Sequence, residues 1–507
     1  MKQTGESVNQ QTDDLSDILK IRNEKYEKII QMGINPYSYK YDRTHTTREI
    51  IDRYDTLEGS RVAISGRLMA IREHGKACFG DIVDAEDRIQ IYVRKNDIGD
   101  EKFELFQLLD IGDFIGISGE VLKTRTGEIT IKVDDFELLA KSLRPIPIVK
   151  EKIEDGQRVV YDQFADKELR YRQRYLDLLL NREVREIFKQ RSQIIRLMRN
   201  FLDSKGFMEV ETPTLQPIYG GASARPFTTH HNALDMTLYL RIADELYLKR
   251  LIVGGFEGVY EICKDFRNEG IDRFHNPEFT MMELYVAFKD YYYMMTLFEE
   301  MVSTIAQELL GTQKIRMGEH EIDLTPPWQR LDLFEAIEKY SGHNLSDKSL
   351  EEIRAIAKAL HVEIDASMGR GKLIDEIFSE VVEPHLIQPV HIMDHPIELS
   401  PLAKKHRSKP GQVERFESMI GGREMCNAFS ELNDPFDQKQ RFENQMKLRD
   451  AGDDEAQMMD EDYVRAMEYG MPPTAGIGVG VDRLVMLLTN QPSIRDVLLF
   501  PHMRPIE

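Results

Sequence analysis

The chain has 507 residues, of which 41% are apolar and 31% charged, and its formal net charge is −21. This composition is typical of a soluble globular protein, and the length predicts two or more domains because one core rarely grows beyond roughly 300 residues. The acidic balance argues against a broadly basic nucleic-acid-binding coat, although it leaves room for a local basic or stacking surface that binds RNA.

The cysteines and the amino terminus limit the class of protein further. Cys78, Cys263 and Cys426 are far apart and lie in no CxxC or Cys/His cluster, so we expect neither a disulfide framework nor a zinc site. The amino terminus is polar, without the apolar core of a signal peptide, and no run of about 18 apolar residues occurs. These features predict a cytoplasmic protein without a membrane segment.

Residues 1–59 are expected to form a tail and one helix. The first 15 or so residues are rich in Gln, Ser, Asp and Thr, a composition typical of disorder. From Asp14 to about Met32, apolar residues recur at helical spacing, which predicts an amphipathic helix.

Residues 60–145 carry five strand-like runs bounded by Gly, Asp and Asn, with a short helical segment between the third and the fourth. This is the order of a five-stranded OB β-barrel, a fold that often binds oligonucleotides. Alternation along the second and third runs points Phe79 and Gln90 outward, where a ring and an amide could hold one base. The alternative is that Phe79 packs under a neighbouring loop.

A linker is expected at 146–180, because the prolines of LRPIPIVKE fit neither a helix nor an inner strand. Residues 181–507 alternate helices and strands without a repeated βα period, which predicts an α+β domain with an antiparallel sheet flanked by helices. Within it, residues from about 330 to 410 carry helical patterns and are interpreted as a mostly helical insertion.

Four segments of this domain combine strand patterning with polar residues that do not suit a plain core. They are GFMEVETPTL (206–215), KDFRNEGIDRFHNPEFTMMELY (264–285), GGREMCNAFSEL (421–432) and GIGVGVDRLVMLL (476–488). In the second segment, Arg267 and Glu269 share one face of a strand, and the returning strand places Glu283 and Tyr285 on one face. An ordinary cross-strand Arg–Glu pair explains only one of these glutamates.

The third and fourth segments carry further polar patterns. Glu417 and Glu424 are seven residues apart; such carboxylates can hold Mg²⁺ on phosphate oxygens, although glutamates at this spacing more often face solvent. Alternating glycines at 476, 478 and 480 leave bare backbone where a flat ring could lie, or where two elements pack closely. The pattern is not GxGxxG and lies in no βαβ unit, so a dinucleotide fold is not indicated.

In this order, the first, second and fourth segments resemble motifs 1, 2 and 3 of the class II aminoacyl-tRNA synthetases. The similarity extends from about residue 15 to the final FPHMRP and is greatest with the lysine-specific branch of that family. The resemblance implies an OB domain that binds the anticodon of tRNA(Lys) and a catalytic domain that forms a homodimer through motif 1. The implied activity is ATP-dependent conversion of L-lysine to lysyl-adenylate, with Mg²⁺, and transfer of lysine to the 3′ end of the tRNA.

The resemblance also implies roles for individual residues. Arg267 and Arg483 are the implied catalytic residues on the α- and γ-phosphates of ATP, with further ATP contacts from Glu269, His275, Phe279 and Gly480. The implied lysine pocket consists of Glu245, Glu283, Tyr285, Asn427, Phe429 and Glu431. Glu417 and Glu424 would hold magnesium, and Phe79, Gln90 and Glu128 would contact the anticodon.

On this interpretation, the cation that balances Glu283 arrives with the substrate. Arginine would clash in such a pocket, ornithine would not reach the carboxylates, and a neutral side chain would leave buried charges unpaired. One departure from the family concerns motif 2: many relatives have arginine before His275, whereas this chain has Phe274 there and Arg273 one position earlier. Cys426 lies where glycine is commoner.

Three alternatives stay open. They are an aspartyl- or asparaginyl-type synthetase, a catalytically inactive tRNA-binding paralogue, and a ligase that attaches lysine to a protein. Loss of Arg267, Arg483 or the two magnesium glutamates would favour the inactive paralogue, and all four residues are present. Protein-modifying ligases of this kind lack an anticodon domain, whereas this chain retains residues 60–145.

Overall fold

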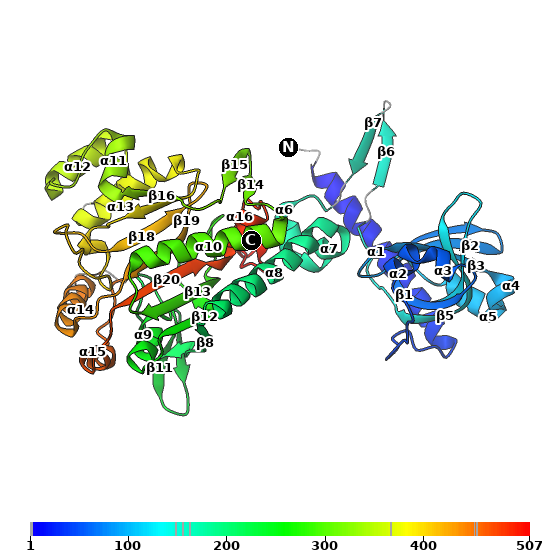
Figure 1. Ribbon diagram of the computed structural model, residues 1–507. Helices are drawn as coiled ribbons and strands as arrows, with labels where there is room; N and C mark the ends of the chain where they lie inside the picture. Colours follow the sequence, from blue (N-terminus) through cyan, green and yellow to red (C-terminus); the bar gives the residue numbers. More distant parts are fainter. Residues whose placement is uncertain are drawn as a thin grey trace. The chain divides into compact units, whose positions relative to one another are not determined.

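The computed structural model describes residues 4–147, 150–154, 157–161, 164–365, 368–450, 452 and 455–506. The chain folds as two compact units, Met1–Ala165 and Asp166–Glu507, each with its own hydrophobic core (Figure 1). The division between the units falls inside the expected linker at 146–180. The ranges predicted for the individual domains stay a prediction.

The amino-terminal unit begins with a long helix, α1 (Thr4–Gln31), followed by the short helices α2 (Thr47–Asp52) and α3 (Tyr54–Leu57). Helix α1 therefore extends to Thr4, through the segment where composition predicts disorder. Gln and Glu are good helix formers, so a polar segment can continue a helix whose later turns are held by tertiary contacts. Ile29 in the last turns is fully buried in the barrel core.

Five strands of this unit close into a barrel in the order β1-β2-β3-β5-β4, which confirms the predicted OB fold. The strands and the helices between them are β1 (Arg61–His74), β2 (Ala77–Val83), β3 (Arg88–Arg94), α4 (Lys95–Ile98), α5 (Asp100–Gln107), β4 (Phe114–Lys123) and β5 (Ile129–Ala140). Along β3, Ile89, Ile91 and Val93 are buried and alternate with half-buried residues. The period of two thus places Gln90 and Tyr92 on the outer face.

The segment expected to be a linker contains regular structure. It forms a two-stranded antiparallel hairpin of β6 (Lys150–Glu154) and β7 (Gln157–Tyr161), followed by helices α6 (Lys167–Arg172) and α7 (Arg174–Leu180). Prolines exclude only the inner positions of strands and helices, and the residues after LRPIPI are free to pair.

The second unit is built on an eight-stranded sheet in the order β16-β17-β18-β19-β20-β13-β12-β8. These strands are β8 (Met208–Glu209), β12 (Gly258–Phe266), β13 (Glu278–Ala287), β16 (Gln329–Asp332), β17 (Val390–Met393), β18 (Arg415–Met419), β19 (Glu424–Ser430) and β20 (Thr474–Gly480). Neighbours are antiparallel, as predicted, except for the two edge pairs, β16 with β17 and β12 with β8, which are parallel.

Smaller sheets and helices surround the central sheet. The small sheets contain β9 (Leu215–Gln216), β10 (Thr228–His231) and β11 (Met236–Leu240), and β14 (Lys314–Met317) and β15 (His320–Asp323). The helices are α8 (Arg182–Ser204), α9 (Glu245–Val253), α10 (Tyr291–Leu310), α14 (Pro435–Asp450), α15 (Glu461–Glu468), α16 (Val481–Leu488) and α17 (Ile494–Val497).

The two faces of the central sheet differ in chemistry. Helices α8, α10 and α16 cover one face and form the main core with apolar strand residues such as Met282, Leu284 and Ile477 (Figure 1). Helix α9 contacts β12 and β13. Because side chains alternate along a strand, the residues between those apolar ones, among them Glu283 and Tyr285, lie on the opposite face.

The segment expected to be a helical insertion contains α11 (Leu333–Ser341), α12 (Leu350–Ala359), α13 (Arg370–Val381) and the short 3₁₀ turns η1 (Glu383–His385) and η2 (Ile397–Leu399). The helices α11 to α13 enclose a small core of their own. Strand β17 lies in the same range and belongs to the central sheet, so this range also supplies part of the framework.

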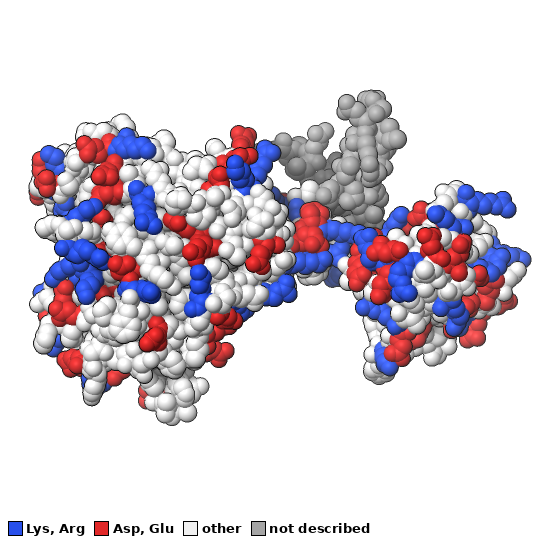
Figure 2. All heavy atoms as spheres, in the orientation of Figure 1, with Lys and Arg blue, Asp and Glu red and all other residues white. Residues whose placement is uncertain are grey.

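The described residues show no extended basic region on the face drawn in Figure 2, and the described helices show no membrane-spanning segment. On the face drawn in Figure 2, Lys and Arg side chains are interspersed with Asp and Glu over each unit and form no single basic surface. Among the described residues, no helix combines the length and the apolar character that a bilayer crossing requires.

The second unit should become less stable as the pH is lowered, because of His395. The side chain is buried, its Nε2 lies 3.2 Å from the carbonyl oxygen of Ile392, and burial together with the charge of Arg415 lowers its pKa well below 6.5. Below about pH 6.5 the imidazole of His395 is protonated in the unfolded chain but stays neutral in the folded chain. The free energy of unfolding should therefore fall by about 1.4 kcal/mol per pH unit. Denaturant unfolding measured between pH 7.5 and 5.5 should show that the free energy of unfolding falls more steeply with decreasing pH for the natural chain than for His395→Asn. Equal pH dependences of the two proteins would refute this assignment.

Candidate active site

The polar face of the central sheet brings together residues from four strands. They are Glu261, Cys263 and Asp265 of β12, Glu283 and Tyr285 of β13, Asn427 and Phe429 of β19, and Arg415 and Glu417 of β18. The strand register pairs Glu261 with Glu283 and Asn427 with Gly478, so polar side chains distant in sequence become neighbours. This face carries four of the six predicted lysine-binding residues.

Strand β20 lies between β13 and β19 and carries the alternating glycines. A Cβ atom at Gly476 would collide with the ring of Tyr285 and the carboxylate of Glu431, and one at Gly478 would lie 3.2 Å from Cε of Met281. Of the two interpretations offered by the sequence, close packing therefore applies at Gly476. The glycines leave room for larger side chains on the neighbouring strands.

A lysine lies inside the predicted acidic pocket. The ammonium group of Lys249, on α9, forms ion pairs with both Glu245 and Glu431 and is fully buried. The rings of Tyr285 and Phe429 flank it, with centroids 5.8 and 5.3 Å away. Two of the three predicted pocket glutamates thus have a cationic partner within the chain, which leaves Glu283 as the one that the substrate would balance.

Glu283 differs from the other two glutamates. Its Oε2 accepts a hydrogen bond of 2.8 Å from the Tyr285 hydroxyl, and no cationic side chain among the described residues pairs with it. Burial, followed by the charges of Asp244 and Asp265, raises its pKa well above the usual range for glutamate. A bound cation at this position would remove that penalty.

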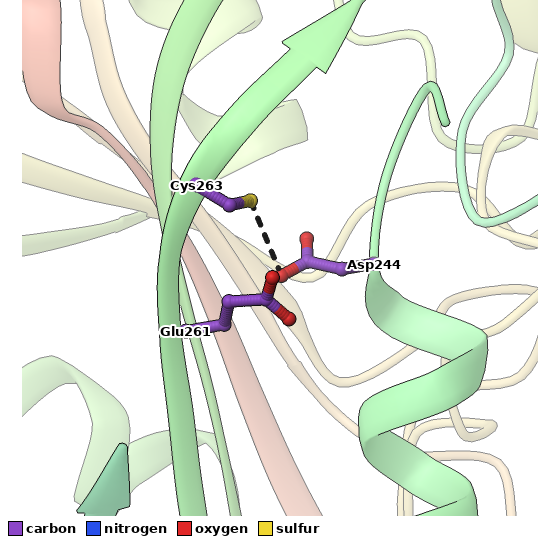
Figure 3. Close-up of side chains that lie close together, drawn as sticks. All are labelled: Asp244, Glu261 and Cys263. Atoms are coloured by element: carbon purple, nitrogen blue, oxygen red, sulfur yellow. Dashed lines mark hydrogen bonds between the residues drawn. The ribbon is translucent and has the colours of Figure 1, made fainter. Parts of the chain in front are cut away.

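A wall of further carboxylates adjoins Glu283. Arg241 forms ion pairs with Glu261 at 2.7 Å and with Asp265 at 3.5 Å. Asp244, immediately before α9, accepts a hydrogen bond of 3.5 Å from the thiol of Cys263, which projects from β12 toward it (Figure 3). Asp244 and Asp265 are not predicted from the sequence, because each lies in a segment where the helix or strand pattern gives no reason to expect a buried acid.

Arg267 lies at the end of β12, at the entry to the motif 2 loop. Its Nε donates a hydrogen bond of 3.4 Å to the carbonyl oxygen of Ile242, and its guanidinium lies 5.1 Å from the ring centroid of Phe279. Glu269 and His275 line a pocket of about 270 Å³, together with Gly270, Ile271, Asp272 and Arg504. The loop is therefore hollowed where the resemblance implies ATP.

The unusual Phe274 in this loop contacts an arginine from the turn between β18 and β19. The guanidinium of Arg423, next to β19, lies 3.9 Å from the centroid of the Phe274 ring. Burial and the charges of Arg273 and Arg483 lower the pKa of Arg423. Three arginines thus lie close enough to influence one another beside the predicted phosphate site.

The predicted metal-binding glutamates are both held by arginines. Arg483 Nη1 donates a hydrogen bond of 2.9 Å to Glu424 Oε2, and Arg415 Nη2 donates one of 2.6 Å to Glu417 Oε1. Burial, opposed by Arg415 and reinforced by Glu424, raises the pKa of Glu417 to about 8. Burial and the charge of Glu424 also raise the pKa of Glu383, on η1, to about 7. This local surplus of negative charge fits a divalent cation.

The remaining predicted contacts on this face are also defined. Arg415 Nε donates a hydrogen bond of 3.0 Å to Asn427 Oδ1, and Arg483 Nη2 lies 3.3 Å from His275 Nε2. Gly480 ends β20 and immediately precedes α16, which carries Arg483. The two arginines therefore link the predicted metal, ATP and lysine residues into one network.

The outer face of the OB barrel carries the predicted anticodon residues. Phe79 stacks on Tyr92 with a centroid distance of 4.6 Å, and Gln90 Oε1 accepts a hydrogen bond of 2.8 Å from Thr130. Phe79 and Gln90 line an open pocket of about 370 Å³, with Arg72, Thr124, Arg125 and Thr126. Glu128 pairs with Arg88 at 3.3 Å and is not among the residues lining that pocket. The two lining arginines are not predicted, since single arginines on strands and turns are common.

Comparison with known proteins identifies the class of this chain. The family of class II tRNA synthetases for aspartate, lysine and asparagine (D, K and N) matches residues 166–504, and the OB-fold nucleic acid binding domain family matches residues 62–139. The chain therefore belongs to the class II tRNA synthetases of the D, K and N type.

Relatives define the branch within this class. Lysine–tRNA ligases from Moorella thermoacetica, Pelotomaculum thermopropionicum and Carboxydothermus hydrogenoformans are 55%, 56% and 54% identical to this chain. The alignments cover 97%, 98% and 97% of this chain and 99%, 96% and 99% of the respective relatives. Within its class, the chain belongs to the lysine–tRNA ligase family.

Proposed function

We propose that this enzyme activates L-lysine with ATP and transfers it to tRNA(Lys), and that the side-chain ammonium of the substrate binds at Glu283. The observation that carries the proposal is the charge balance of the buried face. Arg241 pairs with Glu261 and Asp265, and Lys249 pairs with two further glutamates, but Glu283 has no cationic partner among the described residues. The kinship to lysine–tRNA ligases supports lysine over the aspartyl, asparaginyl and inactive alternatives.

The proposed pocket suits an ammonium group on an alkyl stem. Glu283 supplies the charge, Tyr285 supplies a hydroxyl already bonded to it, and the Phe429 ring lines the path of the methylenes. Glu245, Asn427 and Glu431 complete the wall, with Lys249 fixing two of the glutamates in place. An uncharged amino acid would leave Glu283 buried and unpaired, which costs several kcal/mol.

The proposed reaction has two steps and needs no protein nucleophile. A carboxylate oxygen of lysine attacks the α-phosphorus of ATP, an O–P bond forms, the bond to the bridging oxygen breaks, and pyrophosphate leaves. A terminal ribose hydroxyl of the tRNA then attacks the activated carbonyl carbon, and AMP leaves as the ester forms while the hydroxyl proton passes to solvent or phosphate. Arg267 and Arg483 orient the phosphates and neutralise charge that develops on their oxygens.

Magnesium belongs to this proposal. Glu417 and Glu424 would hold the ion, which supplies charge neutralisation at the triphosphate oxygens when bound. Arg483 and Arg415 already fix the orientation of both carboxylates. The expectation that the protein needs no zinc stays a prediction.

The proposal also includes a homodimer and a cytoplasmic location. Strand β8, in motif 1, is the edge strand of the central sheet, and Met208 and Leu215 near it are 44% and 49% exposed. An open sheet edge with exposed apolar side chains is suited to pairing with a second copy. Sedimentation equilibrium should give a mass of twice 59.0 kDa; a monomer at micromolar concentration would count against the dimer.

Gly476→Ala should damage the lysine pocket. The added methyl group meets the Tyr285 ring and the Glu431 carboxylate, and overpacking of this kind costs about 1–3 kcal/mol. We expect kcat/KM for lysine in ATP–pyrophosphate exchange to fall at least ~10-fold. Gly478→Ala is the matched control, because its methyl group lies 3.2 Å from the movable end of Met281 and otherwise only in ordinary contact, at 3.8 Å, with Glu283. Equal effects of the two variants would contradict the packing argument.

Phe79→Ala should affect tRNA use and leave amino-acid activation alone. If Phe79 stacks on an anticodon base, its loss removes about 1–3 kcal/mol, which corresponds to ~10–100-fold in kcat/KM for tRNA. ATP–pyrophosphate exchange without tRNA should stay at the natural rate. Phe79→Tyr, which keeps a stacking ring, is the control, and an unchanged charging rate for Phe79→Ala would remove this residue from the anticodon site.

A further inference from the structure

Three buried carboxylates from three elements converge beside the proposed lysine pocket. Asp244 precedes α9, Asp265 lies on β12 and Glu283 lies on β13. One oxygen from each lies within 4.8 Å of the other two, and the residues are 0%, 1% and 6% exposed. This separation is close to that of oxygens bound to a common cation.

In two of these carboxylates, one of the two oxygens lacks a hydrogen-bond partner among the described residues. Asp244 Oδ1 and Asp265 Oδ2 are buried atoms that accept no hydrogen bond from any described residue. A buried ionised oxygen without a partner costs several kcal/mol, so such atoms indicate a missing ligand or proton. Burial and the charge of Glu261 raise the pKa of Asp265 to about 6, with Arg267 and Arg241 opposing the rise.

The donor atoms select the kind of cation. Three carboxylate oxygens favour a hard ion such as Mn²⁺, Mg²⁺ or Ca²⁺. Each of these ions takes about six or more oxygen ligands, so water would complete the coordination, and Mn²⁺ is the one that electron paramagnetic resonance detects.

A neighbouring set of side chains is less suitable. Asp244, Glu261 and Cys263 also offer atoms within 4.8 Å of one another (Figure 3). However, Glu261 is fully engaged, since Oε1 accepts from Arg241 and Oε2 from Thr212. The oxygens without partners therefore belong to the first set, which consists of Asp244, Asp265 and Glu283.

We propose that Asp244, Asp265 and Glu283 form a site for one hard divalent cation such as Mn²⁺, on the inner wall of the lysine pocket. The site is distinct from the proposed magnesium site at Glu417 and Glu424. Because Glu283 belongs to both sites, the metal and the substrate ammonium exclude each other, a consequence that rests on the proposed function. Free divalent metal then competes with lysine during activation.

Mn²⁺ titration of the full chain without ATP, followed by electron paramagnetic resonance, tests the site directly. A Glu417→Gln/Glu424→Gln background removes the other proposed metal site. In this background we expect one bound Mn²⁺ per chain, and adding Asp244→Asn or Asp265→Asn should weaken its binding at least ~10-fold. Cys263→Ser is the matched control, since it keeps all three carboxylates and should bind as the background does. Thermal unfolding verifies that each variant is folded.

The outcomes separate the two proposals. The cation site is overturned if the Glu417→Gln/Glu424→Gln variant binds no Mn²⁺. It is also overturned if folded variants with either aspartate substitution bind Mn²⁺ as tightly as that variant does. Neither result affects the proposal of lysine activation. Binding that depends on the aspartates and is displaced by millimolar lysine supports both the site and the shared Glu283. Aspartate-dependent binding that lysine does not displace overturns the proposed sharing of Glu283 between the metal and the substrate.

Discussion

Arg267→Ala should reduce lysine-dependent ATP–pyrophosphate exchange by at least ~10³-fold, the scale on which positioned arginines act in phosphoryl-transfer sites. Arg267 lies at the end of β12, where its guanidinium faces the motif 2 loop next to Phe279. It is only partly buried and makes one weak hydrogen bond, to Ile242. Its removal should therefore affect the transition state far more than the fold.

Arg267→Lys separates charge from geometry. Lysine keeps the positive charge but lacks the planar fork that binds two phosphate oxygens at once. We expect this variant to recover part of the activity, with far-ultraviolet circular dichroism and unfolding midpoint close to those of the natural chain in both variants. Pyrophosphate exchange near the natural rate in Arg267→Ala would remove Arg267 from the catalytic site.

Lys249→Met should destabilise the catalytic unit by about 3–5 kcal/mol, because it leaves Glu245 and Glu431 buried without their cation. Lys249 is fully buried, and the two carboxylates raise its pKa above the usual value for lysine despite that burial. The measurement is the free energy of unfolding in urea at pH 7.5.

A compensating substitution tests the cause of that loss. Lys249→Met combined with Glu431→Gln restores the charge balance and should recover at least half of the lost free energy, since one buried charge is removed with its partner. A Lys249→Met variant as stable as the natural chain would show that the ion pairs are absent in solution. A double variant no more stable than the single one would point to lost packing instead of lost charge.

The sequence predicts local patterns well in this chain. Alternation along the third barrel run correctly separates buried Ile91 from half-buried Gln90, and the fold class follows from the order of strands and helices. The central sheet follows from the absence of a βα repeat. Its parallel edge pairs do not, because pairing between segments distant in sequence leaves no periodic pattern.

The charge balance of the site is the part that local patterns do not reveal. Glu283 stands out in the sequence because an acid interrupts an apolar run. Lys249 gives no such indication, since a lysine in an amphipathic helix normally faces solvent. Asp244 and Asp265 acquire their meaning only when α9 and β12 bring them to Glu283. The number of buried cations and anions is therefore a property of the tertiary structure.

The central claim is that an otherwise unpaired acid on an inner strand receives the amino-acid side chain's ammonium group. Its most direct test is ATP–pyrophosphate exchange measured for each of the twenty amino acids, with the natural chain and with Glu283→Gln. We predict that lysine alone gives efficient exchange and that kcat/KM for lysine falls at least ~10²-fold in the variant. Comparable exchange with a neutral amino acid, or full lysine activity in Glu283→Gln, would contradict the claim.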